Sequence, residues 1–198
     1  RTQSQTYDAL GQRVASTDPA GNTTQYRYDA LGRQIETIDS LNQSTKQSWN
    51  AQDQLTAVTD ANGNTHRFDY DKAGRLIKEA RPLGGAIEYS YDAADQLTKR
   101  TDAGTNTRTY TYDTAGRLTA ARAPGGTHYQ YGYATSGGCG ANTAAGANSN
   151  RTTATVNGAT VATFCYDNAD RLTSLTSTTA PYNAYTGTIT YDQWGNTT

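Results

Sequence analysis

Aromatic residues recur at one fixed interval along this chain. Steps of 21 residues separate Tyr7, Tyr28, Trp49, Tyr70, Tyr91 and Tyr112. A polar residue precedes each of them, and another aromatic residue often stands two positions earlier, as Phe68 does before Tyr70. Alternation with a period of two places these aromatic side chains on one face of a β-strand. The longer period predicts a repeat architecture, in which each unit packs against its neighbours.

A turn is predicted directly after each of these aromatic residues. Asp71 and Gly74 hold the first and fourth places of one such turn, which suits a type I turn. The glycine is expected to adopt a positive φ and to close a bulged hairpin. The same fourth place is held by Gly11, Gly32, Gly116 and Gly195, and by Asp53, Asp95 and Asp170 in other units. A second turn, for example Asp18-Pro19-Ala20-Gly21, follows about ten residues later.

Each unit therefore holds two strands, which we expect to be about six to eight residues long. Stacked in order, the hairpins predict an all-β fold: one antiparallel sheet that curls, because long twisted sheets do not stay flat. Regular hairpins are expected over residues 1–132. An insert over 133–165 is expected to hold an exposed Gly/Ala/Asn-rich loop and a hairpin turn at Asn157-Gly158. Irregular units beginning at Tyr166 and Tyr191 fill residues 166–198.

The composition indicates a thin sheet that is partly exposed to solvent. Hydrophobic residues make up 34% of the chain, with 15 Tyr, 2 Phe and no Met. The net charge of −1 comes without a basic patch, so nucleic acid is not expected as a partner. No apolar run is long enough to predict a membrane span. Both ends fall within a repeat, and the segment, in which no signal peptide is recognised, is expected to be part of a longer array.

The candidate chemistry is sparse. Each of the repeated Asp residues begins a turn, so capping of the turn explains them better than a catalytic pair of carboxylates. Residues 60–64 resemble a calcium loop that lacks its glycine, and no metal or cofactor is expected. His66 and His128 stand alone and are expected to face solvent. Tyr129, Tyr182 and Tyr185 lie outside the 21-residue phase, which makes them the candidates for a surface glycan ligand.

Cys139 and Cys165 are the only cysteines. Cys165 should face away from the aromatic ladder, on the face that holds polar residues in other units. Cys139 lies in the insert, which could fold back over that face. If the protein is exported, a disulfide that pins the insert is expected; two free thiols in a cytosolic protein are the alternative.

The Tyr-Asp-x-x-Gly-Arg-Leu pattern resembles the YD repeat of the Rhs family. It stands in Tyr70-Asp71-Lys72-Ala73-Gly74-Arg75-Leu76 and in Tyr112-Asp113-Thr114-Ala115-Gly116-Arg117-Leu118, and nearly the whole chain shares it. The family includes Rhs toxins, the C components of insecticidal toxin complexes, and teneurins. The resemblance implies a hollow β-shell, which in the bacterial members encloses a cytotoxic polypeptide. The family's catalytic core-end segment has no counterpart here, so no catalytic residue is carried over.

These observations predict a non-enzymatic wall segment of a shell that encapsulates a toxin or other cargo. Its partners would be the rest of the same shell and the enclosed polypeptide, in a secreted or cell-surface setting. The alternative is an extracellular adhesion or carbohydrate-binding array, and an enzyme ranks third.

Overall fold

The computed structural model describes residues 2–177 and 186–197. Within these residues the chain forms 17 β-strands, which belong to one antiparallel sheet, and one short 3-10 helix. The predicted all-β fold of consecutive hairpins is confirmed, whereas the curl of the sheet and its part in a closed shell stay predictions. Two compact units are distinguished, residues 1–89 with 101–105 and residues 90–100 with 106–198. The predicted division into regular and irregular repeats stays a prediction.

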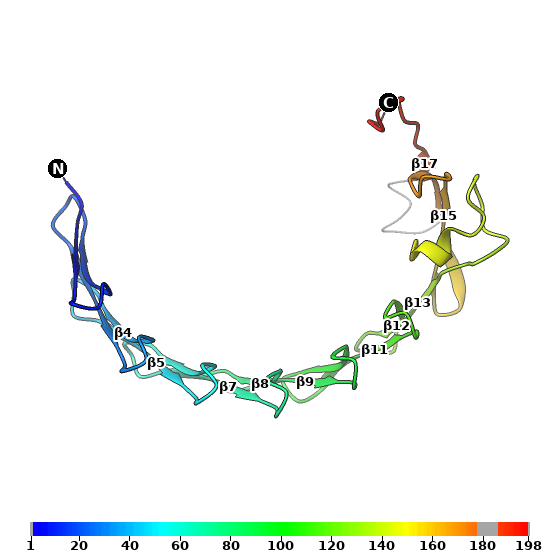
Figure 1. Ribbon diagram of the computed structural model, residues 1–198. Helices are drawn as coiled ribbons and strands as arrows, with labels where there is room; N and C mark the ends of the chain where they lie inside the picture. Colours follow the sequence, from blue (N-terminus) through cyan, green and yellow to red (C-terminus); the bar gives the residue numbers. More distant parts are fainter. Residues whose placement is uncertain (1, 178–185, 198) are drawn as a thin grey trace. The chain divides into compact units, whose positions relative to one another are not determined.

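Strands follow one another in chain order within each unit (Figure 1). The N-terminal half contains β1 (Ser4–Tyr7), β2 (Arg13–Thr17), β3 (Thr23–Tyr28), β4 (Gln34–Ile38), β5 (Ser44–Trp49), β6 (Leu55–Thr59), β7 (Thr65–Tyr70), β8 (Leu76–Ala80) and β9 (Ala86–Tyr91). The C-terminal half contains β10 (Leu97–Asp102), β11 (Asn106–Tyr112), β12 (Leu118–Arg122), β13 (His128–Gly132), η1 (Ala145–Asn148), β14 (Thr153–Val156), β15 (Ala159–Tyr166), β16 (Leu172–Ser177) and β17 (Gly187–Thr188).

A β-bulge lies at the repeated aromatic residue in six hairpins, namely β1–β2, β3–β4, β5–β6, β7–β8, β11–β12 and β15–β16. In the β7–β8 pair, Asp69 lies opposite Lys78, but the register then shifts and Tyr70 lies opposite Leu76. The same shift occurs between Arg27 and Tyr28. Bulges of this kind follow from a residue in the left-handed region at the turn. Because the turn and its bulge take residues out of the ladder, several strands are only four or five residues long, shorter than predicted.

The predicted turn conformations are confirmed. Gly32, Gly74 and Gly116 have φ of 80°, 85° and 80°, and Asp53 takes the same region with φ of 60°. At Asn157 and Gly158 both φ values are positive, and Val156 pairs with Ala159 across this two-residue turn. Such a geometry is a type I′ turn. The local sequence therefore fixes each turn.

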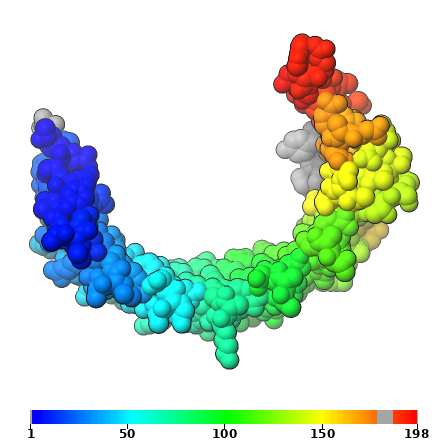
Figure 2. Space-filling model, viewed as in Figure 1, coloured from blue at the N-terminus to red at the C-terminus, as the bar shows by residue number. Residues whose placement is uncertain are grey.

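The sheet has little fully buried surface. The chain exposes 12276 Å², whereas a globular protein of 21.3 kDa would expose about 9,100 Å². From the viewed side, no second layer covers the blue-to-cyan hairpins of the first unit (Figure 2). In the second unit a small core forms around Ala154, Val161, Ala162 and Leu175. The sheet is thus largely a single layer, and both of its faces are exposed to solvent.

The insert differs from the predicted exposed loop. Ala145 in η1 is 1% exposed, and Gly146 is also buried. A Cβ on Gly146 would lie within 2.5 Å of the backbone of Tyr133 and Ala134, so the insert packs backbone to backbone. That close packing, available only to glycine, is why a Gly/Ala-rich segment is partly buried here.

Candidate functional surface along the turns

A ladder of side chain to backbone hydrogen bonds links hairpins to the ones that precede them. The hydroxyl of Tyr70 donates to the Leu55 carbonyl at 2.9 Å, and the indole of Trp49 donates to the Gln34 carbonyl at 2.9 Å. In each case the acceptor lies 15 residues earlier. The same spacing holds for Tyr28, Tyr112, Tyr133 and Tyr166, and Tyr191 reaches 19 residues back to Leu172. The repeated aromatic side chains therefore join consecutive hairpins.

The point at which the strand ladder ends explains why the Leu55 carbonyl needs a donor. The ladder between β6 and β7 ends at the Ala57–Arg67 pair, so Leu55 lies beyond it. A half-buried carbonyl without a partner is costly, and the Tyr70 hydroxyl satisfies it. Burial raises the pKa of Tyr112 and Tyr166, which keeps their hydroxyls protonated as donors.

Tyr133 belongs to this ladder although sequence reasoning did not include it. Its hydroxyl donates to the Leu118 carbonyl at 3.0 Å. The signal was available, because Tyr133 stands 21 residues after Tyr112, but the missing Asp at Ala134 obscured it. The next acceptor is Arg151, to which Tyr166 donates at 2.8 Å. The insert is therefore one turn, between Tyr133 and Arg151, that has been enlarged.

Turns that begin with Asp or Asn are capped by that first residue. In one turn, Asp71 Oδ1 accepts from the backbone N–H of Ala73 at 2.9 Å and of Arg75 at 3.0 Å. The Arg75 guanidinium closes the turn by pairing with Asp71 Oδ2 at 2.7 Å. Asn50 caps its turn through the same backbone contacts, to Gln52 and Gln54. The repeated Asp residues thus act on their own backbone.

Hydrogen bonding lowers the pKa of these carboxyl groups. The Arg75 backbone N–H is the largest contribution that lowers the pKa of Asp71, and the Arg117 side chain is the largest for Asp113. In turns that end in asparagine, the side-chain amide lowers the pKa of Asp18 and Asp60. All of these groups are stabilised in the charged form, which suits a cap rather than a catalytic acid.

The turns also contact one another along the side of the sheet on which the strands end. Arg33 Nη1 donates to the Asn50 carbonyl and to Asp53 Oδ1 in the next turn, both at 2.8 Å. Gln54 Nε2 donates to the Gly74 carbonyl at 2.8 Å. Arg117 extends the pattern by donating to the Gly146 carbonyl of the insert, and its guanidinium lies 4.5 Å from the Tyr133 ring centroid. Polar side chains of one turn therefore contact the next turn at several places in the repeat.

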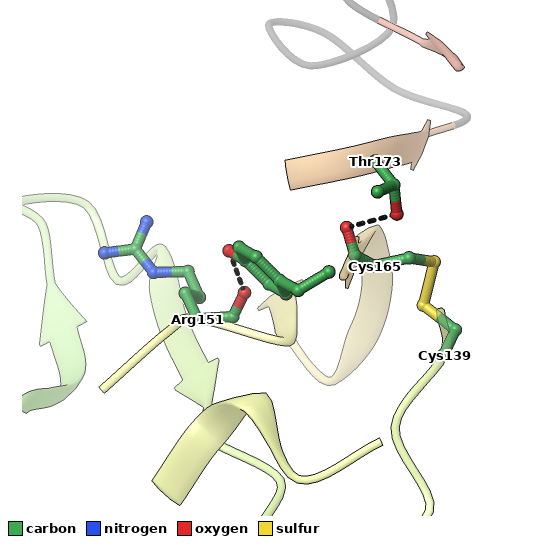
Figure 3. Close-up of a disulfide and its surroundings, with 5 residues drawn as sticks. Cys139, Arg151, Cys165 and Thr173 are labelled. Carbon is green, nitrogen blue, oxygen red and sulfur yellow. Dashed lines mark hydrogen bonds between the residues drawn. A yellow bond between two sulfur atoms is a disulfide. The ribbon is translucent and has the colours of Figure 1, made fainter. Parts of the chain in front are cut away.

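The insert is held by the cysteines and by one aspartate. Cys139 and Cys165 form a disulfide with a Cα–Cα distance of 4.8 Å (Figure 3). Gly140 bridges to Tyr166, and a Cβ on this glycine would lie 2.4 Å from the Tyr166 carbonyl. Asp170 accepts from the side-chain amides of three insert residues, at 2.8–2.9 Å, namely Asn142, Asn148 and Asn150. The insert thus lies against the hairpin that contains Cys165.

The remaining candidates are only partly exposed. His66 is half-buried on the same face as Phe68, with its ring 4.7 Å from that of Phe68 and its Nε2 3.0 Å from Glu79 Oε1. The predicted solvent-facing orientation of His66 is therefore wrong, and His128 is half-buried as well. Tyr129 is 37% exposed. Tyr182 and Tyr185 lie outside the described residues.

A groove lies between two turns of the first unit. It has a volume of about 490 Å³ and is lined by Asn50, Gln54, Phe68, Tyr70 and Asp71, among others. Among the described residues, no three His, Cys, Asp or Glu side chains are grouped to hold a metal. The helical part of the described chain offers no segment with the length and apolarity of a membrane span.

Comparison with family models decides the affiliation. The RHS repeat model matches residues 7–44, 49–86 and 91–128, which together are more than half of the chain. The chain belongs to the RHS repeat family. Successive RHS matches begin 42 residues apart, so each covers two of the 21-residue units. At the sequence level, none of the curated proteins matches the chain.

Solved structures share the fold of this RHS repeat segment. The crystal structure of TcdB2-TccC3-Cdc42 matches 96% of the chain with a TM-score of 0.57 and 21% identity. TcdB2-TccC3 without its hypervariable C-terminal region matches 98% of the chain, with a TM-score of 0.56 and 19% identity. A Photorhabdus luminescens Tc holotoxin pore matches 94%, with a TM-score of 0.55 and 19% identity. The chain spans about a tenth of the length of these structures.

Proposed function

We propose that this RHS repeat segment forms part of the wall of a shell that encapsulates a toxin or other cargo polypeptide. The observation that carries the proposal is the joining of consecutive hairpins by the aromatic ladder, as between Tyr70 and Leu55. A wall needs lateral continuity rather than a thick core. Here continuity comes from backbone ladders and polar contacts, and fully buried side chains are few among the described residues.

The likeness to TcdB2-TccC3 supports this function at the level of the fold. A sheet with two solvent-exposed faces suits a wall that separates an interior from the solvent. The proposed partners are further hairpins of the same shell and an enclosed polypeptide, and the segment acts as a structural component rather than as an enzyme.

The test is limited proteolysis of the complete gene product. If the wall encloses cargo, the cargo polypeptide resists a protease under native conditions and becomes sensitive when the wall is loosened. Tyr28→Ala with Tyr70→Ala removes two links of the ladder and should expose the cargo. Tyr129→Ala, at an exposed position outside the ladder, is the matched control and should leave the cargo protected. If the protease digests the cargo at the same rate in the native protein, in the double variant and in the Tyr129→Ala control, enclosure is contradicted.

We also propose an exported or cell-surface location. The support is the Cys139–Cys165 disulfide, because such bonds persist in oxidising compartments. Cell fractionation of the source organism, with the cysteine redox state measured in each fraction, tests this location. Reduced cysteines and recovery only from the cytosol would overturn it.

Carbohydrate binding is a second candidate because of the groove beside Phe68 and Tyr70. Aromatic rings together with the amides of Asn50 and Gln54 are the groups that bind sugars in proteins. Glycan-array binding that is lost in Phe68→Ala and kept in Leu41→Ala, an exposed position outside the groove, would favour an adhesive role. Absence of glycan binding in the native protein would remove this candidate.

A further inference from the structure

Two kinds of turn alternate through the regular part of the chain. One kind ends in glutamine and the other in arginine, in the order Gln12, Arg33, Gln54, Arg75, Gln96 and Arg117. The residue in the left-handed position of the next turn alternates as well. It is Gly32, Gly74 or Gly116 after a glutamine turn, and Asp53 or Asp95 after an arginine turn. A 42-residue period is therefore superimposed on the 21-residue repeat.

A glutamine turn crowds the Cβ position of the left-handed residue on the next turn. Gln54 Nε2 donates to the Gly74 carbonyl at 2.8 Å, and a Cβ on Gly74 would lie 3.1 Å from this nitrogen. The corresponding distance is 3.0 Å from Gln12 to Gly32 and 3.0 Å from Gln96 to Gly116. Glycine at this position therefore avoids a tight contact with the glutamine, in addition to permitting the positive φ.

An arginine turn instead supplies a donor that an aspartate can satisfy. The Arg33 guanidinium pairs with Asp29 of its own turn at 2.7 Å and with Asp53 of the next turn at 2.8 Å. Aspartate tolerates the left-handed region better than most residues, so Asp53 provides the carboxylate and keeps the turn. Charge-assisted pairs of this geometry are among the stronger hydrogen bonds.

We propose that these contacts form a pairing rule that determines which hairpin can follow which. A glutamine turn requires a glycine turn after it, whereas an arginine turn permits an aspartate turn, so the unit of assembly is two hairpins. The rule concerns the stacking of hairpins and does not depend on any cargo. Arg171 lies 3.7 Å from the Cβ position of Gly195, which shows that an arginine turn also accommodates glycine. The glutamine turn is therefore the one that restricts the turn after it, whereas an arginine turn can be followed by aspartate or by glycine.

The first test exchanges one pair in the 198-residue chain. Gly74→Asp alone should lower the thermal midpoint by about 2–4 °C or more, because it combines left-handed strain with the contact to Gln54. Adding Gln54→Arg should restore at least half of that loss by recreating the arginine–aspartate pair. Gly63→Asp is the matched control. Gly63 has φ of 84° and nothing within 4 Å of its Cβ position, so Gln54→Arg should not rescue it.

The second test compares deletions of one and of two units. Deleting residues 28–48 places Gln12 before Asp53, which is a mismatch, whereas deleting 28–69 places Gln12 before Gly74, which is a match. The longer deletion should melt at the higher temperature, although more of the sheet is lost. Deletion of 49–69 is the length-matched control, since it places Arg33 before Gly74, an accommodated pair. Additive effects in the exchange, or a shorter deletion at least as stable as the longer, would overturn the rule.

Discussion

At the scale of single residues, the hydroxyl explains why the ladder consists mainly of Tyr rather than Phe. The chain has 15 Tyr and 2 Phe, and in the described ladder the polar atom of the ring reaches a backbone carbonyl. Because the acceptor is backbone, its own side chain is free to vary, and Arg13, Gln34 and Leu55 all serve.

Replacement of Tyr70 by Phe isolates this hydroxyl. Tyr70→Phe should destabilise the protein by about 0.5–1.5 kcal/mol, since the half-buried Leu55 carbonyl loses its donor while the ring remains. Denaturant unfolding followed by circular dichroism measures the change. Tyr129→Phe, at an exposed position outside the ladder, is the control and should be close to neutral. Equal effects at both positions would show that the ladder hydroxyl adds no stability.

At the scale of the hairpin, the turn caps make stability depend on pH. The folded pKa of Asp71 and Asp113 lies below the usual value of 3.8, so their stabilisation is fully present above that value. It is lost as the pH falls through the lowered folded values. The unfolding midpoint should therefore drop on acidification below about pH 4.

Asp71→Asn separates the cap from its titration. Asparagine keeps the backbone contacts, as Asn50 does in its own turn, but cannot lose a charge. The variant should start less stable at neutral pH, because the Arg75 pair is weakened, and should lose less stability on acidification. Glu88→Gln, an exposed carboxylate on β9, serves as the control. If the Asp71→Asn variant loses as much stability on acidification as the native protein, the explanation is wrong.

The enlarged turn is the element most dependent on a covalent link. Cys139→Ser with Cys165→Ser should destabilise the insert by about 3 kcal/mol in the chain-entropy model, while the hairpins of the first unit keep their stability. Mass spectrometry with alkylation should find no reactive cysteine before reduction of the native protein and two afterwards. Alkylation of both cysteines without reduction would contradict the bond.

At the scale of the whole molecule, stability should be distributed unevenly along the sheet. Each hairpin packs on its sequence neighbours, as expected for a repeat protein, so opening is local. The amides of β1, whose residues are all exposed, should exchange fastest with solvent. Those of β15, which holds Val161 and Ala162, should exchange slowest. Hydrogen exchange with mass spectrometry checks this order, and one common rate for all strands would indicate a single cooperative unit instead.

The sequence by itself determined the hairpins, their order and the conformation of each turn. These features depend on residues within about one turn of each other, such as Asp71 and Gly74, whose steric and capping preferences act locally. Only the tertiary structure decided that the Tyr133 hydroxyl donates to the Leu118 carbonyl, that Asp170 accepts three amides, and that Arg33 pairs with Asp53. Their partners lie 15 to 28 residues away in sequence. Such contacts exist only once neighbouring hairpins stack and place their turns side by side, which no local preference specifies.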